Sequence, residues 1–140
     1  MLGFDLTEDA ASVTFVEGPN PSTHGQAALM VTQLNSPVGV GFLLEQGSLD
    51  FVTIDNSQKP SSACPGVAQN LMTPFSVRIR EAAGTTYWDV YDGMKWNTPC
   101  SHLDVFDMSK SSVVMQAGTY MMETMPPGTA AFDNYNLGPK

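Results

Sequence analysis

The feature that most restricts the fold of this chain is a succession of short strand-like runs separated by turns, with no amphipathic helical stripe over three turns. The chain contains 12 Gly and 10 Pro, which favour many turns between these runs. Short strands at this spacing predict an all-β, two-sheet antiparallel β-sandwich that forms a single domain over residues 1–140. The predicted strands cover residues 12–16, 27–33, 38–45, 48–54, 75–81, 85–91, 102–107, 112–122 and 129–137.

The charge balance excludes some classes of partner. Only 14% of the residues are charged, and the formal net charge is −8. The six Lys and Arg residues form no run, whereas phosphate binding needs clustered basic side chains. We therefore expect no nucleic-acid partner, and we expect no insertion into a membrane because no apolar run approaches the length of a spanning helix.

The two cysteines, Cys64 and Cys100, both lie in proline-containing loops. Two loop cysteines in a turn-rich chain of low charge favour one disulfide, although two unpaired thiols in an intracellular protein remain the alternative. Neither a CxxC nor an HxxxH spacing occurs, so a zinc site is not expected.

One predicted pair of strands allows a detailed register. Apolar and polar residues alternate strictly in residues 75–81, and Ala83-Gly84 suits a two-residue hairpin turn before residues 85–91. Placing Ala82 opposite Thr85 sets Ile79 against Trp88 on the core face. The opposite, open face then carries the polar and aromatic residues Ser76, Arg78, Arg80, Tyr87, Asp89 and Tyr91.

Three stretches resemble sequences of the concanavalin A-like lectin/glucanase superfamily, whose fold is a jelly-roll sandwich. The first runs from Phe75 through the hairpin to Asp92-Gly93-Met94-Lys95-Trp96. The second, Val114-Met115-Gln116-Ala117-Gly118-Thr119-Tyr120, is similar to a late strand of that superfamily, and the third, Ala131-Phe132-Asp133-Asn134-Tyr135-Asn136-Leu137, to its closing strand. The resemblance implies the same fold, which hosts lectins, hydrolases, lyases and adhesion modules.

Aromatic side chains on an open sheet face are the physical basis of sugar binding, because the C–H faces of a sugar pack on the rings. We therefore expect a non-catalytic carbohydrate-binding or adhesion-type module rather than an enzyme. In the alternative, Trp96 closes the end of the core and the tyrosines are only cross-strand partners. The residues expected to bind the glycan are Tyr87, Tyr91, Trp96, Arg78, Arg80 and Asp89.

Two carboxylates suggest a structural calcium ion. Gly3-Phe4-Asp5 is similar to the first strand of many modules of this superfamily, and Asp5 would meet Asp133 of the closing strand if the two end strands pair. Hard oxygen ligands suit Ca²⁺. The alternative is that Asp133 only caps a strand.

Two other functions stay open. The stretch from Gln116 to Tyr120 is similar to an alginate-lyase motif, which would make Tyr120 the proton-transfer residue of a polysaccharide lyase acting on a polyuronate. The family lysine is replaced by Gln116, however, and the paired carboxylates of retaining glucanases are missing from the sequence. The other functional hypothesis is a structural or orphan domain with a protein partner.

The opening residues, Met-Leu-Gly-Phe-Asp-Leu, lack the basic and apolar regions of a signal peptide. The resemblance nevertheless favours the mature domain of a secreted or extracellular protein over an intracellular chain.

Overall fold

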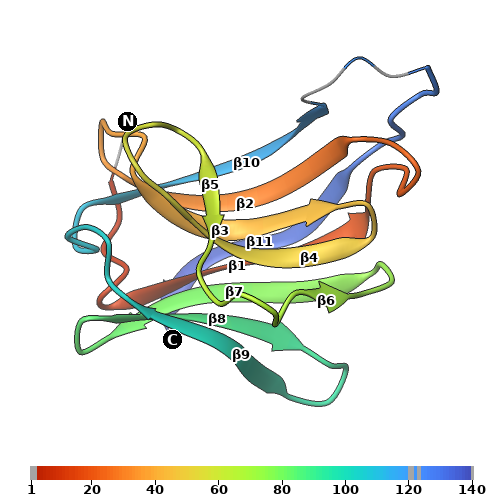
Figure 1. Cartoon of the computed structure of the whole chain (residues 1–140). Coiled ribbons are helices and arrows are strands. Elements are labelled where there is room, and N and C mark those ends of the chain that lie inside the picture. Colours follow the sequence, from red (N-terminus) through yellow and green to blue (C-terminus); the bar gives the residue numbers. More distant parts are fainter. Residues whose placement is uncertain (1–2, 120–121, 123, 140) are drawn as a thin grey trace.

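The computed structural model describes residues 3–119, 122 and 124–139, and within them every regular element is a β-strand. Figure 1 shows the strands arranged in two packed layers. The all-β, two-sheet antiparallel sandwich predicted from the sequence is therefore confirmed. The strands are β1 (Asp9–Glu17), β2 (Gly25–Gln33), β3 (Gly39–Glu45), β4 (Ser48–Ile54), β5 (Pro60–Ser62), β6 (Gln69–Asn70), β7 (Phe75–Ala82), β8 (Thr85–Tyr91), β9 (Trp96–Leu103), β10 (Ser111–Thr119) and β11 (Ala131–Pro139).

One layer is a five-stranded sheet with the order β11-β1-β7-β8-β9. The other is a six-stranded sheet in which β10-β2-β3-β4-β5 follow one another and β6 pairs with β4. All pairings are antiparallel. No helix long and apolar enough to cross a membrane occurs in the described part of the chain.

The predicted hairpin of β7 and β8 is confirmed in its register. Ile79 pairs with Trp88, Arg78 with Asp89, and Ala82 with Thr85. Ala83 and Gly84 both have positive φ, 52° and 79°, which is the conformation that a tight hairpin turn requires. The period-two pattern of the sequence therefore sets which side chains face the second sheet and which face solvent.

The core lies between the two sheets and is filled by apolar side chains that alternate along each strand. Trp88 is fully buried, and its indole Nε1 donates a hydrogen bond of 2.8 Å to the carbonyl oxygen of Gly41 on β3. This bond links the two sheets through the centre of the core. Phe42 and Phe51 make an edge-to-face contact with their ring centroids 5.7 Å apart.

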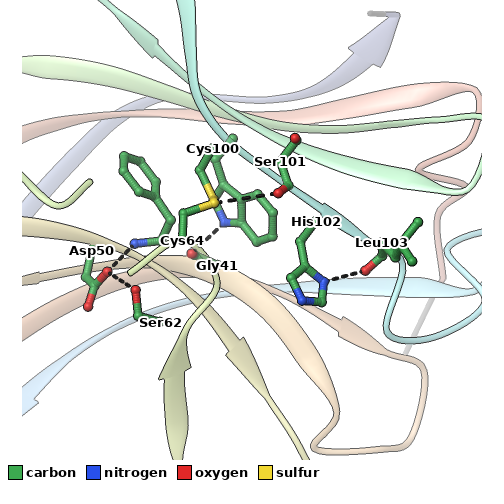
Figure 2. The surroundings of a disulfide bond; sticks show 10 residues. Gly41, Asp50, Ser62, Cys64, Cys100, Ser101, His102 and Leu103 are labelled. Carbon is green, nitrogen blue, oxygen red and sulfur yellow. Dashed lines mark hydrogen bonds between the residues drawn. A yellow bond between two sulfur atoms is a disulfide. The ribbon is translucent and has the colours of Figure 1, made fainter. Parts of the chain in front are cut away.

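A disulfide between Cys64 and Cys100 confirms the predicted pairing and excludes the two free thiols. Cys64 follows β5 of the six-stranded sheet, and Cys100 lies on β9 of the five-stranded sheet, so the bond joins the two layers along one flank (Figure 2). Beside it, the Ser62 hydroxyl donates to Asp50 Oδ1 at 3.1 Å and holds β5 against β4.

The predicted strand at residues 102–107 is wrong for most of its length. The strand in this region is β9, Trp96–Leu103, and residues 104–107 form a turn-like connection instead. The reason is that Val105 and Phe106 both pack against the core, which an alternating strand does not permit. The short strands β5 and β6 lie in what the sequence predicts to be a loop.

Candidate functional site

The candidate site lies on the face of the five-stranded sheet that points away from the core, which we call the outer face. The side chains of Ser76, Tyr87 and Tyr91 on this face are half-buried, so solvent reaches them. The structure brings all of the predicted ligand-binding residues together on this face, from β7, β8 and the start of β9.

Asp89 is the centre of the polar network on the outer face. Its side chain is 0% exposed although it points away from the core, because Arg78 and Arg80 lie over it with 22% and 25% of their side chains exposed. Arg78 Nη2 and Arg80 Nε approach Asp89 Oδ2 at 2.7 and 2.8 Å. The Thr98 hydroxyl donates to Asp89 Oδ1 at 2.7 Å. Asp89 is thus a covered carboxylate shared by two arginines.

The electrostatics of Asp89 follow from two opposing effects. Burial disfavours the charged carboxylate, but hydrogen bonds from Arg80, Thr98 and Arg78 outweigh it, and the net pKa of Asp89 lies below its ordinary value. The carboxylate therefore stays ionised and fixes both guanidinium groups in place.

The three aromatic side chains of the site are arranged around these arginines. The Arg78 guanidinium lies 4.5 Å from the Trp96 ring centroid, and the Arg80 guanidinium lies 4.4 Å from that of Tyr87. Tyr91 contacts Trp96, with the two ring centroids 5.4 Å apart. Neither of the two arginine contacts described above involves the Tyr91 ring. Of these three rings, Tyr91 alone lines the adjacent pocket, and it is therefore the ring best placed to stack against a ligand.

An open pocket of about 460 Å³ borders Tyr91 at one end of the outer face. Polar groups converge on it from three strands. The hydroxyls of Thr14 on β1 and Ser76 on β7 are 2.8 Å apart, and the side-chain amide of Asn134 on β11 donates to Thr14 Oγ1 at 3.4 Å. Leu71 and Met72, from the loop before β7, supply an apolar wall. This mixture of apolar side chains, aromatic rings and a few polar groups is typical of small-ligand sites.

The turn between β8 and β9 forms another wall of the pocket and is held by Asp92. Its carboxylate accepts hydrogen bonds from the backbone N–H of Lys95, from the Asn97 side chain and from the backbone N–H of Met94, which lower the pKa of Asp92 to about 2. These bonds fix the turn next to Tyr91.

Thr14, Asn134 and Thr98 are site residues that the sequence reasoning missed. Thr14 reaches the site because β1 lies beside β7, and Asn134 because β11 lies beside β1. Such long-range neighbours leave no local pattern. Ser76 carried a signal, since the alternation in β7 places it on the outer face.

The structure does not bring the two expected calcium ligands together. Asp133 pairs with Thr14, whereas the Asp5 carbonyl accepts a hydrogen bond from Asp9 N, at the other end of β1. Asp9 and Thr14 are separated by about 16 Å of extended chain. Phe4, next to Asp5, pairs with Ser111 in the other sheet and not with β11. Among the described residues, no group of three or more His, Cys, Asp or Glu side chains could hold a metal ion.

The lyase candidate Tyr120 lies outside the described residues. The residues before it, Gln116 to Thr119, are on β10 of the six-stranded sheet, away from the outer face of the five-stranded sheet.

Comparisons with known proteins give a fold relative but no family. No family model matches the chain, and no curated protein sequence matches it. The chain is similar to the crystal structure of a functionally unknown protein from Saccharomyces cerevisiae, with 18% sequence identity and a TM-score of 0.58. The similarity covers 100% of this chain and 74% of that chain. At this identity the likeness concerns the fold alone.

Proposed function

We propose that this protein is a non-catalytic glycan-binding module whose binding surface is the outer face, ending in the pocket beside Tyr91. The observation that carries this proposal is the convergence, on one solvent-accessible sheet face, of aromatic rings and fixed polar groups next to an open pocket. A sugar presents both an apolar C–H face and a ring of hydroxyls, and it needs both kinds of partner at once.

In this proposal each part of the site has a separate task. The Tyr91 ring stacks on the C–H face of a sugar unit, and the Thr14 and Ser76 hydroxyls exchange hydrogen bonds with its hydroxyl groups. The arginines are already fixed by Asp89, so their remaining N–H donors point to a ligand at little cost in side-chain entropy. The overall charge of −8 favours a neutral polysaccharide over an anionic one.

Two further observations support this function and an extracellular location. The concanavalin A-like stretches of the sequence are similar to those of a superfamily that includes lectins, and we propose a jelly-roll relationship on that ground. The Cys64–Cys100 disulfide supports a secreted protein, because disulfides persist in oxidising compartments.

Glycan-array and pull-down binding to neutral polysaccharides tests the proposal. Tyr91→Ala should weaken binding by about tenfold or more, which corresponds to about 1.4 kcal/mol, because stacking on this ring is lost. Tyr135→Ala is the matched control, since Tyr135 is an exposed tyrosine on β11 that does not line the pocket.

Unchanged thermal unfolding of both variants shows that the fold is intact. Wild-type protein that is folded but binds no glycan contradicts the proposal, and so does equal binding by Tyr91→Ala and wild type.

A further inference from the structure

Strand β10 differs from the strands at the other sheet edges. A sheet edge presents unpaired backbone groups, and natural proteins protect such edges with proline, irregular pairing or short length. β5 has three residues and begins with Pro60, β9 contains Pro99 opposite a register shift, and β11 contains Pro139 and two register shifts. β10 has nine residues in unbroken register with β2, with neither proline nor a charged residue.

The backbone orientation of β10 follows from its contact with Phe4. Phe4 N donates to Ser111 O at 2.8 Å and Ser111 N donates to Phe4 O at 2.9 Å, so the backbone groups of Ser111 point away from β2. Alternate residues of an antiparallel strand direct their backbone groups to the same side. The N–H and C=O groups of Val113, Met115 and Ala117 therefore point outward from the sheet edge.

We propose that β10 pairs antiparallel with β10 of a second copy of this chain and joins two six-stranded sheets into one continuous sheet. Phe4 already occupies the outward groups of Ser111, so the added strand must end before that position. A register that pairs Met115 with Ala117 of the partner subunit meets this condition. It places residue 119 of the partner subunit, the last residue of its β10, opposite Val113.

A second copy fits this edge because the strand is complementary to itself. The net charge of −8 opposes self-association in general, but no charge lies on β10, so the two strands meet without like-charge contacts. The two-fold axis passes beside Gln116, whose amide donates and accepts hydrogen bonds and can pair with its own copy. Val114 and Met115 are 37% and 40% exposed, and the pairing covers part of this apolar surface.

Sedimentation or light scattering over a wide concentration range tests the pairing. The wild-type chain of 15.1 kDa should convert to a dimer as its concentration rises. Gln116→Lys should remain a monomer with unchanged thermal unfolding, because two lysines would lie directly opposite each other at the axis. Ser61→Lys is the matched control, since Ser61 is exposed on β5 at the far edge of the same sheet, and it should still form the dimer.

A disulfide measurement checks the register independently of stability. The sequence has two cysteines, and both are in the Cys64–Cys100 bond, so an introduced cysteine has no thiol partner within its own chain. Gln116→Cys should form an interchain disulfide under mild oxidation, because opposite residues of a non-hydrogen-bonded pair have Cα atoms about 4.5 Å apart. Val114→Cys should not, since the two copies of residue 114 would lie about 13 Å apart along the strands.

A wild-type chain that stays monomeric at every concentration overturns the proposal. This holds even if the chain binds an extended peptide from another protein, because the proposed occupant of the β10 edge is a second copy of the chain. A dimer that persists in Gln116→Lys also overturns it, because the interface then lies elsewhere.

Discussion

Replacing Asp89 with Asn tests whether the covered carboxylate holds the outer face together. The two side chains have nearly the same shape, so the change removes the charge and alters little packing. Asp89 accepts hydrogen bonds from Arg78, Arg80 and Thr98, and all three are charge-assisted because the carboxylate is ionised. A hydrogen bond to a charged group contributes about 1.5–3 kcal/mol and a neutral one about 1 kcal/mol. The arginine heads retain contact with water, so we expect Asp89→Asn to lower the free energy of unfolding by about 2–3 kcal/mol at pH 7.

The same network makes a prediction about pH. The pKa of Asp89 is lowered in the folded protein, so the carboxylate stabilises the fold at every pH above its unfolded pKa of about 3.9. This stabilisation is lost as the pH falls through the lower, folded pKa. The difference in stability between wild type and Asp89→Asn should therefore shrink below about pH 4.

Urea unfolding followed by tryptophan fluorescence at neutral and acidic pH measures both effects. Asp133→Asn is the control, because Asp133 is exposed and its replacement should change stability by less than about 0.5 kcal/mol. An Asp89→Asn variant as stable as wild type at pH 7, or a difference that does not vary with pH, would contradict this role of the Asp89 carboxylate.

Two further perturbations concern the core and the disulfide. Trp88→Ala should lower stability by about 3–5 kcal/mol and Trp88→Phe by about 1–3 kcal/mol, because both remove core volume and the hydrogen bond to the Gly41 carbonyl. Chemical unfolding gives the values, and a Trp88→Phe variant as stable as wild type would contradict a role for this hydrogen bond. Replacing Cys64 and Cys100 together with Ala should cost about 3–4 kcal/mol, because the bond closes a loop with a sequence separation of 36. Reductant should lower the stability of the wild-type protein by the same amount, as measured by thermal unfolding with and without it. An unchanged unfolding midpoint would contradict the predicted contribution of the disulfide.

The hairpin of β7 and β8 was predictable because its information is local. Strict alternation in β7 defines the buried face, and the Ala83-Gly84 turn sets the register, so the burial of Trp88 and the pairing of Arg78 with Asp89 follow from adjacent residues. The disulfide was predictable for a different reason, since a chain with two cysteines offers a single pairing.

The rest of the site depends on contacts that no local pattern encodes. β9 contains Pro99 and a register shift opposite Asp89, so its sequence does not alternate like a regular strand, and the sequence reasoning placed the strand too late. The same irregularity brings Thr98 to Asp89. For this reason the alternation in β7 and β8 places Asp89 on the open face but does not show that the two arginines and Thr98 cover it. An exposed cross-strand ion pair contributes less than about 1 kcal/mol, and with Asp89 fully covered we expect Arg78→Ala to cost more than that.

The position of the disulfide makes the two flanks of the sandwich mechanically unequal. Cys64 and Cys100 tie the layers together beside β5 and β9, whereas no second disulfide joins the layers beside β10 and β11 at the opposite flank. We therefore expect the two layers to separate less readily near the Cys64–Cys100 bond than beside β10 and β11. Backbone amides of β10 and β11 should then exchange with solvent faster than those of β4 and β8.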